Sequence, residues 1–342
     1  MKKKKLFWLV VSVPLPLLAI LIFLFLGPAT QFQESARFLY IPTGNNTQSY
    51  LMQQLRDSSY VRNTALFERL ATQLKTWERL KPGKYKIKKG TSLLRLVQQF
   101  RNNQQDPVNL VITKLRTPEQ LAALVGKKFE CDPACFLQFI SSNDSLASLG
   151  VNSESVLSLT MPETYTYFWN VKPAAILQKM KRHYDQFWND ERKQKARQLG
   201  LTPLQVSILA SIIEEETIRH DEKPLIASVY LNRLRKDMFL GADPTVKYAV
   251  GDFSIKRVLL IHINSTAGSP YNTYKNKGLP PGPICTPSGT TIDAVLNAKN
   301  TPYLFFCAKP NGNGYHVFAE TGQEHLENAR AYQKWLDENM IK

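Results

Sequence analysis

Three consecutive glutamates end an apolar segment, Leu204–Thr217, that has the residue spacing of a helix. At about 100° per residue, Ile208, Ile212 and Ile213 fall on one side, the side that a helix turns toward a protein core. Glu216 comes four residues after Ile212 and three after Ile213, so it falls in the middle of this apolar stripe. Burial there disfavours the charged carboxylate and raises its pKa. A raised pKa is what a general acid working near neutral pH requires.

The other two glutamates have plainer interpretations. Glu214 projects nearly opposite Ile212, where water can solvate it, although pairing with an arginine would let it tune the site. Glu215 lies at the edge of the apolar stripe. Glu216 has a structural interpretation too, as a helix-end carboxylate that pairs with Arg219, Arg233 or Arg235. The helix alone does not decide between an ion pair and a general acid.

The N-terminus predicts a membrane anchor for the domain that carries this helix. Four lysines at residues 2–5 precede an uncharged segment, Leu6–Leu26, whose 21 residues are long enough to span a bilayer as a helix. The lysines place that end in the cytoplasm and the rest of the chain outside it. A cleaved signal peptide is the alternative, but its apolar region would be shorter, about 7–15 residues. We therefore assign residues 1–5 to a cytoplasmic tail, 6–27 to a single transmembrane helix and 28–36 to a linker.

The charge of the chain suggests an anionic neighbour. The formal charge is +16, and +12 remains without the four N-terminal lysines. A basic domain beside a membrane suggests lipid head groups or a cell-wall polymer as the neighbour, although simple solubility explains the charge as well. Nucleic acid is excluded as a partner by the predicted topology. The four cysteines complete no zinc-binding pattern, and Cys131 and Cys135 form a disulfide or remain free thiols.

The segment from 37 to 106 reads as a small α+β subdomain. Apolar residues at helical spacing predict helices over 48–57, 63–77 and 91–101, and a strand is expected at 38–42. In a second strand within 80–90, Tyr85 and Ile87 alternate with Lys84, Lys86 and Lys88, which predicts one buried face and one basic exposed face.

The segment from 107 to 342 is expected to form a mixed α/β domain around the glutamate helix. Residues 173–198 have the pattern of one long amphipathic helix, and residues 224–236 predict another. Asp243 is followed by Pro244, which is typical of a helix cap followed by proline at the first helical position. Proline- and glycine-rich loops after the glutamates suit a carbohydrate cleft, although loops of this kind also serve packing.

Several motifs occur in the order seen in the membrane-anchored endolytic murein transglycosylases, the YceG-like family, which the chain resembles over about residues 38–340. The motifs are Ser211-Ile-Ile-Glu-Glu-Glu-Thr217, Ala227-Ser-Val-Tyr-Leu-Asn-Arg-Leu234, Asp243-Pro-Thr-Val-Lys-Tyr248, Tyr271-Asn-Thr-Tyr274, Gly278-Leu-Pro-Pro-Gly282 and Thr301-Pro-Tyr-Leu-Phe-Phe306. Leu80-Lys-Pro-Gly-Lys-Tyr85 looks like the family's LysM-like subdomain, and Met161-Pro-Glu-Thr-Tyr165 resembles its Phe-Pro-Asp-Thr-Tyr block. One departure is the missing Glu-Gly pair near Lys114-Leu115, which puts the interdomain contact there in doubt.

The resemblance implies a fold and a place in the cell. The expected fold class is α+β: a single N-terminal transmembrane helix, a LysM-like subdomain over 37–106, and a catalytic domain over 107–342 with a lysozyme-like glutamate helix. The expected location is the bacterial inner membrane, with the N-terminus in the cytoplasm and the catalytic domain on the outer side.

The resemblance also implies a reaction. In this family the acid lies in a Glu-Thr pair, which corresponds to Glu216-Thr217 here. The expected reaction cleaves the β-1,4 bond between MurNAc and GlcNAc in nascent peptidoglycan, leaves 1,6-anhydro-MurNAc ends and limits strand length. It needs no metal or cofactor, and the expected partners are peptidoglycan strands, the membrane and peptidoglycan synthases. The candidates for sugar contacts or for orienting Glu216 are Asn232, Asp243, Tyr248, Asn272 and Tyr274, each of which also has a structural interpretation.

Two other functions compete with this interpretation. One is a non-catalytic glycan-binding scaffold of the wall-synthesis machinery, but the presence of Glu216 favours the enzyme. The other is a hydrolase that uses Glu216 together with Asp243, because hydrolytic glycosidases place two carboxylates across the bond. A hydrolase would leave a reducing end where a lytic enzyme leaves an anhydro end.

Overall fold

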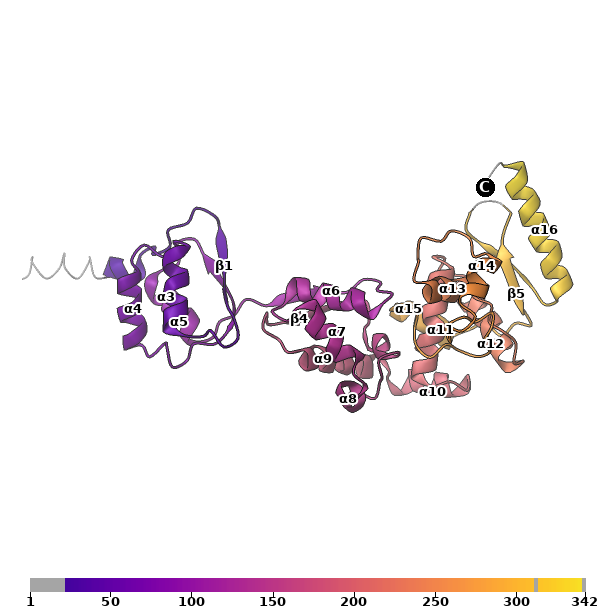
Figure 1. The fold of residues 1–342 in the computed structure, drawn as a ribbon, viewed down its shortest axis with the longest axis horizontal. Helices are drawn as coiled ribbons and strands as arrows, with labels where there is room; N and C mark the ends of the chain where they lie inside the picture. Colours follow the sequence, from indigo (N-terminus) through magenta and orange to yellow (C-terminus); the bar gives the residue numbers. More distant parts are fainter. Residues whose placement is uncertain (1–21, 311–312, 340–342) are drawn as a thin grey trace, which may run out of the picture. The chain divides into compact units, whose positions relative to one another are not determined.

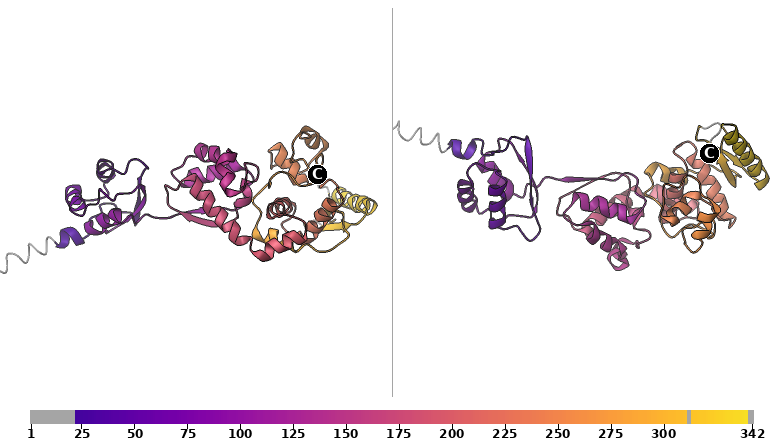
Figure 2. Two further views of the ribbon diagram at one scale, coloured as in Figure 1. Left: turned by 90° about the horizontal axis from the view of Figure 1, so that it is seen from below. Right: turned by 45° about the horizontal axis from the view of Figure 1, so that its top comes forward.

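The computed structural model of the chain describes residues 22–310 and 313–339 (Figures 1 and 2). By its internal contacts, the chain divides into two compact units. The first unit comprises Met1–Asn109 together with the short segments Lys128–Cys131 and Thr166–Val171. The second comprises Leu110–Lys127, Asp132–Tyr165 and Lys172–Lys342.

The first unit packs helices against a two-stranded sheet. Its elements are β1 (Ala36–Ile41), α3 (Gln48–Asp57), α4 (Thr64–Gln73), β2 (Gly83–Lys88) and α5 (Leu93–Arg101). Strands β1 and β2 are antiparallel, with Leu39 opposite Tyr85. Tyr85 and Ile87 are fully buried, and Lys86 and Lys88 are exposed, as predicted. The predicted exposure of Lys84 is wrong, because its ammonium lies 3.1 Å from Asp106 and its side chain is only 15% exposed. Phe32, within the segment predicted to be a linker, is also buried in this core.

The segment that follows builds a small sheet and a set of helices. Strands β3 (Val108–Val111) and β4 (Thr164–Tyr167) pair with each other. The helical elements between and after them are α6 (Pro118–Lys128), α7 (Pro133–Ser141), α8 (Asn143–Leu146), two 3-10 turns (Ala147–Leu149 and Val156–Leu159), α9 (Pro173–Phe187) and α10 (Asp190–Gln198). The prediction of one long helix over 173–198 is wrong. The side chain of Asn189 accepts a hydrogen bond from the backbone of Arg192, which starts α10 as a new helix.

The glutamate helix is the centre of the second unit. This helix, α11 (Pro203–Glu216), packs against α12 (Lys223–Arg235), α13 (Asp243–Val250) and α15 (Gly289–Leu296). The chain then adds α14 (Leu260–Ser265), the antiparallel hairpin β5 (Phe305–Ala308) and β6 (His316–Ala319), and α16 (Gly322–Glu338). Both figures show α16, in yellow, beside β5. Strand β6 and helix α16 were not predicted.

The predicted membrane anchor, and with it the predicted fold class, is corrected by the structure. Across the part of the chain that the structure describes, no helix is long and apolar enough to cross a membrane. Of the predicted segment 6–27, residues 6–21 lie outside the described residues, and helical structure is described only for 22–26. A spanning helix needs about 20 residues. The single-pass inner-membrane location rested on this segment and is corrected together with it. The described chain has a mixed α/β fold.

The sequence left open whether Cys131 and Cys135 form a disulfide, and the structure answers this for Cys135. Cys135 is a free thiol at the surface and Cys285 is a free thiol in the core, where burial raises its pKa well above the ordinary value. The alternative with free thiols therefore holds for Cys135.

Candidate active site

Helix α11 carries Glu216 to the edge of the core of the second unit. The helix starts at a capping box, in which the side chains of Thr202 and Gln205 each accept a hydrogen bond from the other residue's backbone N–H. Eight consecutive residues, from 206 to 213, are buried. The chain leaves the helical conformation at Thr217, so Glu216 is the last helical residue. A fixed start and a buried body hold the terminal carboxylate in place.

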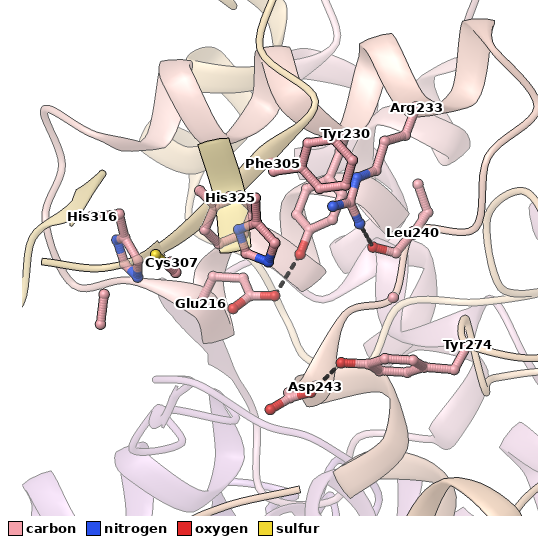
Figure 3. Close-up of a pocket in the computed structure, with 13 residues that line it drawn as sticks. Glu216, Tyr230, Arg233, Leu240, Asp243, Tyr274, Phe305, Cys307, His316 and His325 are labelled. Atoms are coloured by element: carbon pink, nitrogen blue, oxygen red, sulfur yellow. Dashed lines mark hydrogen bonds between the residues drawn. The ribbon is translucent and has the colours of Figure 1, made fainter. Parts of the chain in front are cut away.

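The Glu216 side chain lies on the wall of a pocket of about 500 Å³ (Figure 3). The wall comes from the ends of α11 and α12, the start of α13, the loop that carries Tyr274, the β5–β6 hairpin and α16. The lining residues are Glu216, Tyr230, Arg233, Leu240, Gly241, Asp243, Tyr274, Phe305, Phe306, Cys307, Ala308, His316 and His325. Polar groups that converge on a hollow with an aromatic wall are typical of a binding or catalytic site.

The environment of Glu216 favours its protonated form. The side chain is half-buried, and its Oε1 atom accepts a hydrogen bond of 2.5 Å from the Tyr230 hydroxyl (Figure 3). Burial raises the pKa of the carboxyl to about 7; the hydrogen bond from Tyr230 opposes this shift, and the negative charge of Asp243 adds to it. Near neutral pH, Glu216 can therefore both donate and accept a proton.

Asp243 and Tyr274 form a second polar pair in the pocket. The Tyr274 hydroxyl donates a hydrogen bond of 2.6 Å to Oδ1 of Asp243 (Figure 3). The prediction that Asp243 caps a helix is wrong, because Ala242 occupies the cap position and Asp243 is the first helical residue. Asp243 lines the pocket instead. Burial raises the pKa of Tyr274, so its hydroxyl stays protonated as a donor.

Arg233 closes one wall of the pocket and does not form an ion pair with Glu216. Its Nε donates to the carbonyl of Leu304 at 2.7 Å, and its Nη1 to that of Leu240 at 2.5 Å. The guanidinium also lies over the ring of Phe305, 5.2 Å from the ring centre. Among the described residues, no ion pair includes Glu216, so the ion-pair interpretation of this glutamate fails.

The two neighbouring glutamates have structural partners. Glu214 accepts hydrogen bonds from Lys223 (3.1 Å), Ser288 (3.0 Å) and Thr291. Its predicted solvation is wrong, since the side chain is only 18% exposed. Burial opposes ionisation, but the hydrogen bonds from Thr291 and Lys223 and the charge of Lys223 bring the net pKa of Glu214 below its ordinary value.

Glu215 binds the segment where the sequence departs from the family pattern. Arg116 donates two hydrogen bonds to its carboxylate, at 3.1 and 2.9 Å, and the Lys114 ammonium lies 3.0 Å away. Burial again opposes ionisation, but these two cations lower the pKa of Glu215 overall. In this chain, the segment without the Glu-Gly pair is therefore attached to the glutamate helix.

Three of the six predicted site residues line the pocket together, namely Glu216, Asp243 and Tyr274. The others lie outside its lining and hold loops. Asn232 donates to the carbonyls of Thr301 and Tyr303. Asn272 is fully buried; its amide donates to the carbonyl of Ile263, and its oxygen accepts from the backbone of Tyr274. The ring of Tyr248 packs on that of Tyr271, with centroids 4.6 Å apart.

Four residues of the pocket were not predicted, namely Tyr230, Cys307, His316 and His325, and Arg233 was considered only as an ion-pair partner of Glu216. Tyr230 and Arg233 are three residues apart on α12 and share a face of this helix, but the apolar pattern that predicts the helix does not single them out. A usable signal existed at the C-terminus, where two of the five histidines lie nine residues apart. Among the described residues, no group of three or more His, Cys, Asp or Glu side chains is arranged to hold a metal ion.

Comparisons with known proteins agree on one family. The chain is 43% identical to the endolytic murein transglycosylase of Bacillus subtilis (strain 168) over 124 residues, which are 36% of this chain and 33% of that protein. It is 26% identical to the endolytic murein transglycosylase of Streptococcus pneumoniae (strain ATCC BAA-255 / R6) over 319 residues, 84% of this chain and 57% of that protein. The matched regions thus cover less than two thirds of either relative.

The comparison with solved structures points to the same family as the comparison of sequences. A Listeria monocytogenes protein described as yceG-like, known from a crystal structure at 2.6 Å, aligns with a TM-score of 0.57 and 27% identity. The alignment covers 86% of this chain and 99% of that chain. The model of the YceG-like family matches residues 39–331. Because this match spans most of the sequence and includes every residue of the pocket, the chain belongs to the YceG-like family.

Proposed function

We propose that this chain is an endolytic murein transglycosylase that cleaves the β-1,4 bond between MurNAc and GlcNAc in peptidoglycan strands. The observation that carries the proposal is the Glu216 carboxyl, which lies on a pocket wall with a pKa of about 7. The names of the Bacillus and Streptococcus relatives support the same reaction. The family's Glu-Thr pair adds support, because the match covers Glu216 and Thr217.

One carboxyl group suffices for this chemistry. Glu216 donates its proton to the glycosidic oxygen as the bond from that oxygen to C1 of MurNAc breaks. The C6 hydroxyl of the same MurNAc attacks C1, and the Glu216 carboxylate accepts the hydroxyl proton. The product carries a 1,6-anhydro ring, Glu216 recovers its proton, and no water is consumed. A pKa of about 7 suits both the donation and the acceptance near neutral pH.

The surrounding residues have supporting roles in this proposal. Tyr230 fixes the direction of the Glu216 carboxyl by its hydrogen bond of 2.5 Å. Asp243, held by Tyr274, offers a carboxylate oxygen to sugar hydroxyls. Asn232, Tyr248 and Asn272 act indirectly, because their side chains hold loops outside the pocket lining.

A hydrolase is the second candidate, and one observation favours it. Asp243 brings a second carboxylate to the pocket that contains Glu216, and paired carboxylates are the usual equipment of glycoside hydrolases. In the lytic reaction Asp243 only binds sugar; in a hydrolase it would activate water or attack C1.

The products of murein digestion test the proposal. Purified glycan strands are incubated with the protein, and the fragments are analysed by mass spectrometry. We expect internal cleavage with 1,6-anhydro-MurNAc ends from the wild type, none from Glu216→Gln, and anhydro ends from the control Glu214→Gln. Reducing ends would establish the hydrolase instead. Binding of strands without any cleavage would establish the scaffold.

We also propose that peptidoglycan synthases are partners and that cleavage limits strand length. The support is the substrate itself, since an enzyme that cuts nascent strands works where synthases extend them. Chemical crosslinking in cells, with and without the Glu216→Gln substitution, tests the contact. Longer strands in cells that contain only the variant would support the role in strand length.

A further inference from the structure

A histidine and a glutamate form a second polar unit at the pocket, apart from Glu216 and Asp243. The carboxylate of Glu222 accepts two hydrogen bonds from one residue: Oε1 from the backbone N–H of His316 at 2.8 Å, and Oε2 from ring Nδ1 at 2.9 Å. Glu222 is almost fully buried, with 6% of its side chain exposed. His316 lines the pocket on β6, 94 residues further along the chain.

This geometry fixes the orientation and the tautomer of the His316 ring. The ring packs edge-on against Phe306, with centroids 5.4 Å apart and an interplanar angle of 90°. A carboxylate only accepts hydrogen bonds, so Nδ1 carries the hydrogen, and Nε2 of the neutral ring is left with a lone pair. Among the described residues, no hydrogen bond to Nε2 occurs. In the neutral ring, this lone pair is therefore available to a ligand in the pocket that His316 lines.

The rest of the pocket complements this acceptor. In the view of Figure 3, Glu216 lies between His316 on one side and the Asp243–Tyr274 pair on the other. Tyr230 and Tyr274 direct their hydroxyl hydrogens at the two carboxylates. Besides the proton donor Glu216, the pocket therefore presents two acceptors, Asp243 and the neutral His316 ring. A ligand rich in hydroxyl or amide N–H donors fits such a wall.

We propose that His316 binds the substrate through Nε2, which accepts a hydrogen bond from a hydroxyl or acetamido N–H of the sugar held against Glu216. Glu222 is a positioning residue that acts through His316. The inference rests on the proposed function, because the ligand is a glycan. His183 shows the contrast: its Nδ1 lies 3.0 Å from Glu163, but the residue is outside the pocket lining.

Binding measurements test the contact without turnover. The parent is the Glu216→Gln protein, and the ligand is a defined uncrosslinked glycan strand of alternating GlcNAc and MurNAc, measured by calorimetry. His316→Asn keeps an N–H near the position of Nδ1 for Glu222 and removes the group at Nε2. We expect roughly 5- to 100-fold weaker binding, the range for a lost hydrogen bond in a desolvated site. His183→Asn is the matched control and should bind like the parent.

The tautomer gives a readout that a purely structural role would not move. Long-range nitrogen–proton NMR spectra of the Glu216→Gln protein should show His316 protonated at Nδ1, and the Nε2 resonance should shift on saturation with the strand. Glu222→Gln lets an amide donate to Nδ1, so the proton should move to Nε2 and binding should weaken. In the catalytically intact protein, His316→Asn should raise KM more than it lowers kcat.

Two results would overturn the inference: an Nε2 resonance that does not respond to the strand, or binding by His316→Asn equal to that of the parent. Failure of the proposed function looks different. In that case the wild type releases no anhydro ends, whereas the binding and NMR results for His316 stand on their own.

Discussion

Replacement of Glu216 by Gln should abolish activity and at the same time stabilise the protein at alkaline pH. Gln keeps the shape of the side chain and can accept the hydrogen bond from Tyr230, but it cannot transfer a proton. General acid–base catalysis contributes roughly 10²–10⁴-fold, so the release of anhydro ends should fall at least that far. The stability effect follows from the buried carboxyl.

The size of the stability effect follows from the shift of the pKa from 4.5 to about 7. Below pH 4.5 both the folded and the unfolded chain hold the proton, so the carboxyl does not lower the free energy of unfolding there. As the pH rises toward about 7, the unfolded chain has released its proton whereas the folded chain still holds it. The free energy of unfolding therefore falls until the pH has passed the folded pKa of about 7. At 1.36 kcal/mol per pKa unit, the loss is about 3 kcal/mol at pH 8 and less than about 1 kcal/mol at pH 5.

Thermal unfolding at two pH values measures this difference. Glu216→Gln avoids the loss, so its Tm should exceed that of the wild type by roughly 6–12 °C at pH 8 and by much less at pH 5. Glu214→Gln is the control on the same helix, and we expect it to lower the Tm at pH 8 where Glu216→Gln raises it. The pKa of Glu214 is lowered by its partners, so its carboxylate stabilises the fold at pH 8, and that contribution is lost as the pH falls through the folded pKa.

A Tm difference for Glu216→Gln that does not change between pH 5 and pH 8 would refute the raised pKa. Retained cleavage would refute the role of Glu216 as the acid. If Glu214→Gln lost cleavage while Glu216→Gln kept it, the assignment of the two glutamates would be reversed. Glu215→Gln should cleave strands and lose stability, because Lys114 and Arg116 lose their partner.

Three further predictions concern the neighbours of Glu216 and the first unit. Tyr230→Phe removes a hydrogen bond that favours the Glu216 carboxylate, so the upper limb of the pH–rate profile should move up by about one pH unit. Asp243→Asn removes a charge that raises the pKa of Glu216, so that limb should move down; an inactive variant at every pH would favour the hydrolase. Replacing the exposed Lys86 and Lys88 with Gln should weaken cosedimentation with murein at low salt without changing Tm; undiminished cosedimentation would show that this face is merely solvated.

Local periodicity was enough to predict much of the secondary structure. The alternation in β2 and the apolar stripe of α11 each repeat with the period of their element, so the buried face could be read from neighbouring residues. Glu216 was selected as a candidate in this way, because its position in the stripe depends only on the helix that carries it. The prediction of one long helix over 173–198 was wrong because the amphipathic pattern continues through Asn189. The side chain of Asn189 caps a new helix there, and the periodicity does not show this break.

The tertiary structure decided which groups line the pocket with Glu216, and only Asp243 and Tyr274 among them were candidates from the family resemblance. Tyr230 comes from the next helix, Asp243 from a helix start where it could equally have been a cap, and His316 from a hairpin 94 residues beyond Glu222. Whether Glu214 is solvated depends on what packs against its helix. Here Lys223 and α15 pack there, and Lys223 donates a hydrogen bond to the carboxylate. By itself the sequence determined which carboxylate enters the apolar face, because that is a property of one helix. Which groups surround it depends on packing between elements far apart in the chain, which no local pattern encodes.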